Sequence, residues 1–203
     1  MRSKLDECKT RLKEEMENSL SILRWVNDNK PDHRIVNSIY EISFLKMYLT
    51  WEWFLERTFI FYLMGEKTDR GYCPRSYFNP RDEHHAYAII KGNARYPNWL
   101  DLDFIRDKAE LFFENGSPFK ESLCDKDNIR IALSQMRKIR NNIVHISPRA
   151  KEEYESLIRN EFGILQNLSP GEFLGKIKDE ENKVSYITYY KNILETASDE
   201  IVK

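Results

Sequence analysis

Hydrophobic residues recur at helical spacing along most of the chain. Within the first thirty residues they follow one another at intervals of three or four, which predicts an amphipathic helix over residues 4–28. The polar run 27–32 is predicted to break this helix. A second long helix is predicted from Ile35 to Leu63, and Gly65 is expected to end it. The chain therefore begins as two long helices joined by a short turn.

The rest of the chain is predicted to be helical around one irregular stretch. Residues 65–100 hold turn-forming residues among aromatic ones, with one short helical candidate at residues 83–91. Four bounded helices are predicted beyond it: one from Asp101 or Asp103 to Asn115, one that Asp125 caps and Pro148 closes, one over residues 150–161, and a short one that opens at Ser169. A final helix is predicted from the apolar residues that recur at helical spacing between Ile187 and Ile201.

These elements predict an all-α fold, because no segment shows a convincing strand pattern. We expect a single domain over residues 1–203. It consists of a helical bundle with an N-terminal helix at 1–30, an irregular insertion at 65–100 and a helical C-terminal extension at 149–203.

Composition predicts a soluble protein that stays in the cytoplasm. Of the 203 residues, 41% are hydrophobic and 32% are charged, as in globular domains. Three widely spaced cysteines predict reduced thiols, with neither a disulfide framework nor a zinc site. The charged first residues are unlike a signal peptide, and the most apolar stretch, Phe59–Met64, is too short to cross a membrane.

Charge is distributed unevenly although the net charge is only −1. Residues 128–151 contain no Asp or Glu, and the basic residues there are Arg130, Arg137, Lys138, Arg140, Arg149 and Lys151. Such a segment is typical of a phosphate-binding face, and it is equally typical of a solvated helix face that pairs with acidic segments elsewhere.

The same segment holds Arg140, Asn141 and His145 near the predicted end of a helix. On an ideal helix Arg140 and His145 would point about 140° apart, whereas Asn141 and His145 would share a face. The helix C-terminus would favour a protonated His145. An arginine can hold phosphate charge and a histidine can move a proton, which together suit phosphate-ester chemistry. A histidine that only caps the helix would show the same spacing.

The run Arg140–His145 resembles the R-x4-6-H motif of the HEPN superfamily, including the asparagine after the arginine and the apolar pair before the histidine. Trp51–Glu56, Tyr96–Leu100 and Ser169–Leu174 are similar to segments of the RiboL-PSP-like branch, so the resemblance covers about residues 35–178. HEPN toxins that are silenced by nucleotidylation have a tyrosine two residues after the histidine. Here that residue is Ser147, so we do not expect this form of control.

The resemblance implies a HEPN-type bundle and a metal-independent endoribonuclease without a cofactor. The RNA 2′-OH would attack the adjacent phosphorus and leave a 2′,3′-cyclic phosphate and a 5′-OH. His145 would transfer the proton, Arg140 would stabilise the phosphorane and Asn141 would orient the phosphate or the imidazole. A homodimer is expected, because one motif offers only one histidine. The implied role is a toxin or anti-phage effector, with an antitoxin or other regulatory protein as a further partner.

Residues outside the motif are assigned supporting roles. Arg137, Lys138, Arg149 and Lys151 are expected to bind RNA. Glu52 and Glu56 are expected to fix Arg140, although a salt bridge without catalytic consequence would place them similarly.

The sequence leaves three questions open. His84 and His85 lie beside acidic residues, but adjacent positions point apart and favour a surface location over a metal site. The aromatic and basic residues of 65–100 form either an RNA-binding lid or a satellite hydrophobic cluster. The whole chain is alternatively a non-catalytic HEPN-like module that binds RNA or protein and uses Arg140 and His145 structurally.

Overall fold

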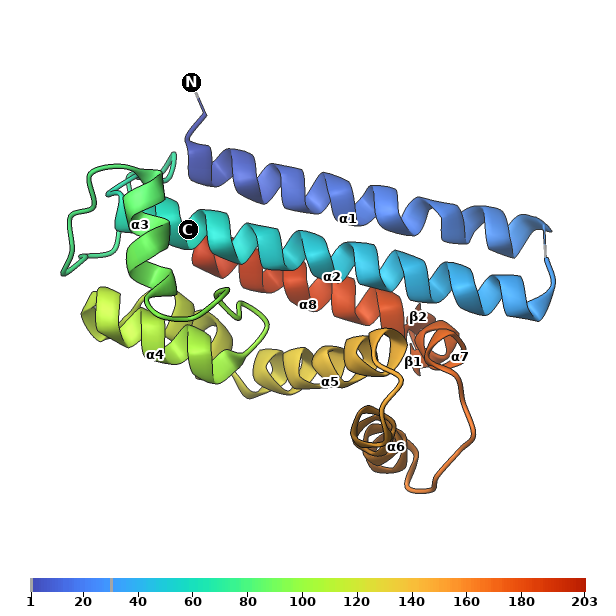
Figure 1. Ribbon diagram of the computed structural model, residues 1–203. Coiled ribbons are helices and arrows are strands. Elements are labelled where there is room, and N and C mark those ends of the chain that lie inside the picture. Colours follow the sequence, from blue (N-terminus) through green and yellow to red (C-terminus); the bar gives the residue numbers. More distant parts are fainter. Residues whose placement is uncertain (1, 30) are drawn as a thin grey trace. The chain divides into compact units, whose positions relative to one another are not determined.

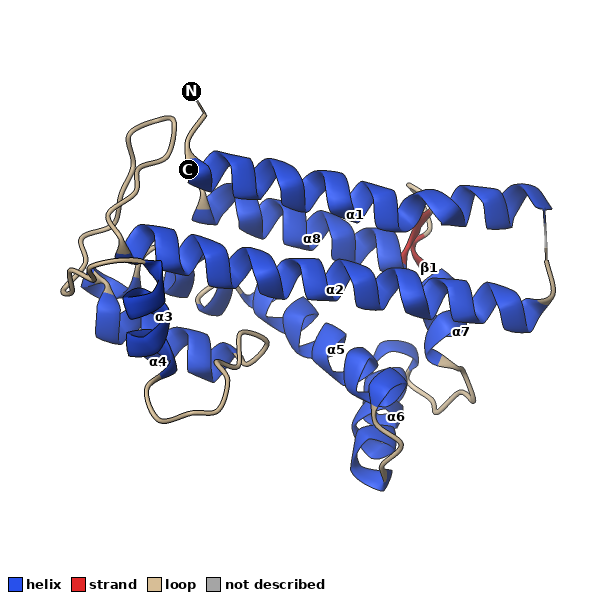
Figure 2. Cartoon of the chain, turned by 45° about the horizontal axis from the view of Figure 1, so that its top comes forward, coloured by secondary structure: helices blue, strands red, loops and turns tan. Residues whose placement is uncertain are grey.

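The structure is a computed structural model that describes residues 2–29 and 31–203 of the chain, apart from the side chain of Asn27. Figure 1 shows a helical chain whose elements are α1 (Lys4–Asn29), α2 (His33–Leu63), α3 (Glu83–Lys91), α4 (Leu102–Phe112), η1 (Glu114–Gly116), η2 (Lys120–Cys124), α5 (Asp127–Val144), α6 (Pro148–Phe162), α7 (Pro170–Gly175), β1 (Ile177–Asp179), β2 (Val184–Ser185) and α8 (Tyr186–Ile201). In Figure 2 strands are confined to β1 and β2. The prediction of an all-α fold is confirmed.

The chain forms two compact units. The first comprises Met1–Glu14, Thr50–Arg130 and Leu194–Lys203, and the second comprises Glu15–Leu49 and Ile131–Ile193. Four helices, α1, α2, α5 and α8, contribute residues to both units. The single domain predicted for the whole chain stays a prediction.

The first unit is organised around the buried ring of Phe59 on α2. Its ring centroid lies 4.7 Å from that of Phe119, 5.0 Å from that of Phe113 and 5.2 Å from that of Trp99. Trp99 is only 2% exposed, so this part of the irregular insertion belongs to a hydrophobic cluster. Tyr96 is 68% exposed, and its predicted role in an RNA-binding lid stays a prediction.

The second unit is held together by a nearly buried carboxylate at the end of α6. Glu161 accepts hydrogen bonds from Gln135 on α5 (2.6 Å), Lys178 on β1 (2.6 Å) and Tyr186 on α8 (2.9 Å). Burial raises the pKa of Glu161, but these donors outweigh it and bring the pKa below its ordinary value. One side chain therefore fixes the C-terminal end of α6 against three other elements.

Helix α7 is attached to α2 within the same unit. Ser169 and Glu172 form the predicted capping box at its start. Gly171 packs so closely that a Cβ atom there would lie 2.4 Å from the carbonyl oxygen of Asn37, and its N–H donates to Glu41 at 3.2 Å. A side chain at this position would push α7 away from α2.

Two local predictions are wrong. The antiparallel pair β1 and β2 was not expected, because two and three residues are too few to show an alternating pattern. Asp125 does not cap α5. It adopts helical dihedral angles and donates its N–H to the carbonyl oxygen of Lys120, so it ends the π-helical turn η2 instead.

None of the described helices combines the length and the apolar character that a membrane span requires. The three cysteines are free thiols, and burial raises the pKa of Cys8 and of Cys124 to about 11. These two thiols are therefore protonated and weak nucleophiles near neutral pH.

Candidate functional site

The predicted motif lies where α5 ends and α6 begins. Leu133, Met136 and Ile139 are buried on one face of α5, which leaves Arg140 and Asn141 half-buried on its other sides. Helix α5 ends at Val144, and only three residues separate it from α6.

The sequence predicted that Pro148 closes α5. In the structure Pro148 instead occupies the first turn of α6. Ser147 adopts an extended conformation and caps α6, because its Oγ accepts the N–H of Ala150 at 3.2 Å. The prediction that the residue before proline leaves the helical region is correct. The C-terminal end of α5 is nevertheless earlier than expected, because His145 already lies outside this helix.

Arg140, Asn141 and His145 lie in contact. The Nη1 of Arg140 donates to Oδ1 of Asn141 at 3.1 Å and lies 3.1 Å from Nε2 of His145. The helical geometry that would separate Arg140 from His145 does not apply, because the helix has ended at Val144. The backbone N–H of His145 still donates to the carbonyl oxygen of Asn141 at 2.9 Å, which keeps the histidine over the last turn.

The contact with Arg140 defines the hydrogen-bonding state of the imidazole. An arginine N–H can only donate, so a hydrogen bond between these two atoms requires Nε2 of His145 as the acceptor. His145 is also exposed.

A small basic pocket lies on one side of His145. It has a volume of about 210 Å³, and its lining includes Asn141, Arg137, Arg149 and Glu153. Arg149 pairs with Glu153 at 3.0 Å. The N-terminus of α6 adds positive potential at this point. Two arginines against one glutamate make this pocket suitable for an anion of phosphate size.

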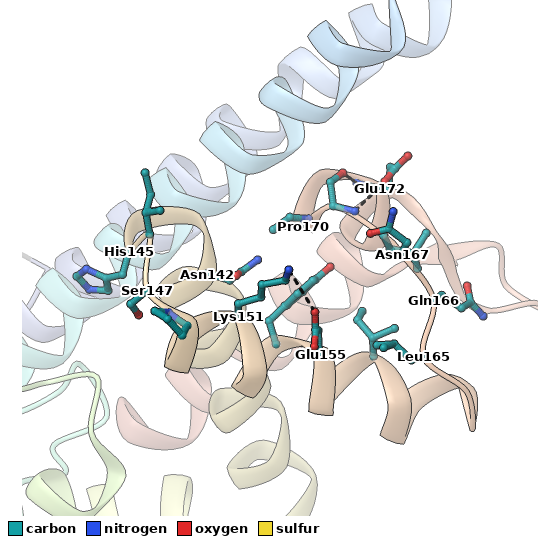
Figure 3. A pocket seen from close by; sticks show the side chains of 16 residues that line it. Asn142, His145, Ser147, Lys151, Glu155, Leu165, Gln166, Asn167, Pro170 and Glu172 are labelled. Atoms are coloured by element: carbon teal, nitrogen blue, oxygen red, sulfur yellow. Dashed lines mark hydrogen bonds and ion pairs between the residues drawn. The ribbon is translucent and has the colours of Figure 1, made fainter.

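His145 also lines a larger cleft, which is drawn in Figure 3. It has a volume of about 970 Å³ and runs between the start of α6 and the loop 163–169. His145 lies at one end, and Asn167, Pro170 and Glu172 lie at the other. Lys151 and Glu155 form an ion pair of 3.8 Å in the lining.

Two further titratable groups line this cleft. Tyr154 is 4% exposed and burial raises its pKa, while its hydroxyl finds no hydrogen-bond partner in the described part of the chain. The hydrogen bond with His33 at 2.9 Å, followed by the one from the N–H of Ser169, lowers the pKa of Glu172. Glu172 is therefore an anion at neutral pH, and its end of the cleft is unfavourable for a second anion.

The predicted RNA-binding residues are distributed over both pockets. Arg137 and Arg149 line the small basic pocket, and Lys151 lines the larger cleft. Lys138 is half-buried on α5 and lines neither of them.

Glu52 and Glu56 belong to the first unit, on α2. Oε2 of Glu56 accepts the indole N–H of Trp99 at 2.9 Å. This partner was not predicted, although the sequence singled out both segments. The expected pairing of Glu52 and Glu56 with Arg140, which lies in the second unit, stays a prediction.

Within residues 2–29 and 31–203, histidine, cysteine and carboxylate side chains form no group of three or more that could hold a metal ion. His85 instead accepts the backbone N–H of Arg81 at 3.2 Å, and Asp82 caps α3.

The chain was compared with protein-family models, curated proteins and solved structures, and none of them matches it significantly. Functional inference therefore rests on the residues of this site.

Proposed function

We propose that this protein is an endoribonuclease of the HEPN type that cleaves RNA without a metal ion. The observation that carries the proposal is the contact of Arg140 with both Asn141 and His145 at the exposed end of α5. His145 also lines both the small basic pocket and the larger cleft. The proposed proton-transfer group therefore borders both a pocket suited to phosphate and a cleft with room for a nucleoside.

The proposed reaction begins when a phosphate of the RNA replaces His145 as the acceptor of the Arg140 N–H. Nε2 of His145 then takes the proton of the ribose 2′-OH, whose oxygen bonds to the phosphorus. The bond from phosphorus to the 5′-oxygen breaks, and that oxygen leaves with a proton from a general acid. The products are a 2′,3′-cyclic phosphate and a 5′-OH. Arg140 stabilises the charge of the phosphorane, and Asn141 orients the guanidinium through its 3.1 Å hydrogen bond.

The general acid is proposed to be the second histidine of a homodimer. Apolar side chains next to the site support this proposal, because Val144 is 47% exposed and Ile146 is fully exposed at 108%. Ile35, Ile42 and Leu49 are also exposed on α2 at seven-residue spacing. A seven-residue apolar repeat is typical of a helix that packs along another helix.

The proposed biological role follows the resemblance. The protein would act in the cytoplasm as a toxin or anti-phage effector, and an antitoxin or other regulatory protein would restrain it. Exposed Val144 and Ile146 beside His145 offer an inhibitor apolar contacts next to the site.

A non-catalytic HEPN-like module that binds RNA or protein is the second candidate. The contact that occupies Nε2 of His145 favours it, because a permanent hydrogen bond from Arg140 would give the histidine a structural role. The two candidates differ in whether the imidazole exchanges protons with bound RNA.

Cleavage assays in the presence of EDTA separate the two candidates. The parent protein should cut single-stranded RNA under these conditions. His145→Ala should slow cleavage by about 100-fold or more while RNA affinity stays nearly unchanged, because a proton carrier acts in the transition state. His84→Ala is the matched control, since His84 is an exposed histidine of α3 in the first unit. Equal rates for folded His145→Ala and the parent would leave only the binding module. Loss of cleavage in EDTA with recovery on addition of magnesium would contradict the metal-free mechanism.

A further inference from the structure

The two pockets that His145 lines differ in charge. The small basic pocket has two arginines, Arg137 and Arg149, against Glu153. The larger cleft has Lys151 against Glu155 and Glu172. The small basic pocket is therefore the more favourable of the two for a phosphate group, whereas the larger cleft favours a neutral or weakly polar group.

Three side-chain amides line the larger cleft without partners of their own. Asn142, Gln166 and Asn167 make no side-chain hydrogen bond to any residue that the structure describes. Asn167 is exposed and the other two are half-buried. Each amide presents a donor and an acceptor side by side. This combination matches the edge of a nucleobase.

The remaining lining provides flat apolar surface of the kind on which a base can stack. Pro148 at the start of α6 and Pro170 at the start of α7 both line the cleft, and Leu165, which also lines it, is 49% exposed. The volume of about 970 Å³ is near the upper end of ordinary ligand pockets and has room for a nucleoside. The cleft is bounded by fixed elements, because Glu161 holds α6 and Gly171 holds α7.

We propose that the larger cleft holds the nucleobase next to the cleaved phosphate, and that Asn142 and Asn167 recognise its hydrogen-bonding edge. This inference rests on the proposed ribonuclease function, in which the cleaved phosphate of the RNA lies beside His145. The cleft then determines at which nucleotide the enzyme cuts, while the small basic pocket binds the backbone irrespective of sequence.

The test measures binding and cleavage separately. The side-chain amide signals of the protein are followed by NMR during titration with the 3′- and 5′-monophosphates of the four nucleosides, and with inorganic phosphate. The signals of Asn142 and Asn167, assigned from their alanine variants, should shift with nucleotide and not with phosphate alone. The dissociation constants for the best and worst base should differ by about tenfold or more. The base that binds best should also be the one beside which a random-sequence RNA is cut.

Variants make the test specific to the cleft. Asn142→Ala should weaken binding of the preferred nucleotide by about tenfold and flatten the cleavage preference. Asn160→Ala is the matched control, because Asn160 is an exposed asparagine of α6 outside the cleft. A second variant, Asn167→Ala, lies in the loop 163–169 and tests the cleft without altering α5.

The outcomes distinguish this inference from the proposed function. If RNA is cut but no nucleotide moves the cleft amides, or all bases bind alike, the base subsite is wrong and the ribonuclease stands. If nucleotides bind with base preference but no RNA is cut, the cleft is a nucleotide site and the ribonuclease is wrong. If neither occurs, both proposals are wrong.

Discussion

At the residue scale, the candidate site depends on the guanidinium of Arg140, whose Nη1 contacts Oδ1 of Asn141 and Nε2 of His145. The guanidinium of Arg140 is thus oriented by hydrogen bonds that a phosphate could replace. Arginine presents several N–H donors in one rigid plane, whereas lysine presents a single ammonium group on a flexible side chain. The proposed chemistry therefore requires the geometry of Arg140 as well as its charge.

Substitutions of Arg140 separate geometry from charge. Arg140→Ala should slow RNA cleavage by about 100–1,000-fold and weaken RNA binding, because it removes a donor that stabilises the phosphorane. Arg140→Lys should recover most of the binding and little of the rate. Single-turnover rates at a series of RNA concentrations give both quantities. Arg159→Ala on the exposed end of α6 is the control. Parent-like cleavage by Arg140→Ala would remove Arg140 from the mechanism.

Much of the site could be predicted from the sequence, and the missing parts have physical reasons. The existence of α5 follows from its apolar spacing and the motif residues follow from the resemblance, whereas both expected ends of α5, Asp125 and Pro148, were wrong. The contact between Arg140 and His145 was not predicted, because an ideal helix was assumed up to Pro148 while α5 ends at Val144. The amides of the larger cleft were missed because Asn142 and Asn167 are far apart in the sequence and line the same cleft only when the second unit is folded.

At the element scale, the width of the larger cleft depends on how α6 and α7 are fastened. Glu161 fastens the end of α6, and Gly171 allows α7 to approach the backbone of α2. The capping box at Ser169 could be recognised in the sequence because it is local. The need for glycine two residues later arises from Asn37, which is far away in the chain, and no local pattern encodes it.

Alanine substitutions test this close packing. Gly171→Ala should destabilise the protein by about 1–3 kcal/mol, because its Cβ would lie 2.4 Å from a backbone oxygen of Asn37. Gly175→Ala is the control within the same short helix, since its Cβ would lie 3.4 Å from a ring atom of Tyr40. Chemical denaturation of both variants measures the difference. Equal stability of the two variants would show that α7 can shift without cost.

At the scale of the whole molecule, the proposed composite site requires two chains. The protein should sediment as a dimer of about twice 24.4 kDa at micromolar concentration, because one chain supplies one of the two proton-transfer groups. Ile42→Asp on the exposed face of α2 should dissociate the dimer and reduce cleavage together. Ile177→Asp, on an exposed residue of β1, should change neither. A monomer with full cleavage activity per chain would contradict the composite site.

The central claim is that the ribose 2′-OH next to the cleaved phosphate attacks the phosphorus. End-group analysis of a short RNA that the protein cuts at one position tests this most directly, when a second copy carries 2′-deoxyribose at the cleaved nucleotide. We predict a 2′,3′-cyclic phosphate and a 5′-OH from the first RNA and no cut at that position in the second, because the attacking oxygen is missing. Cleavage of the deoxy-substituted RNA at the same position, or a 5′-phosphate on the product, would contradict the mechanism.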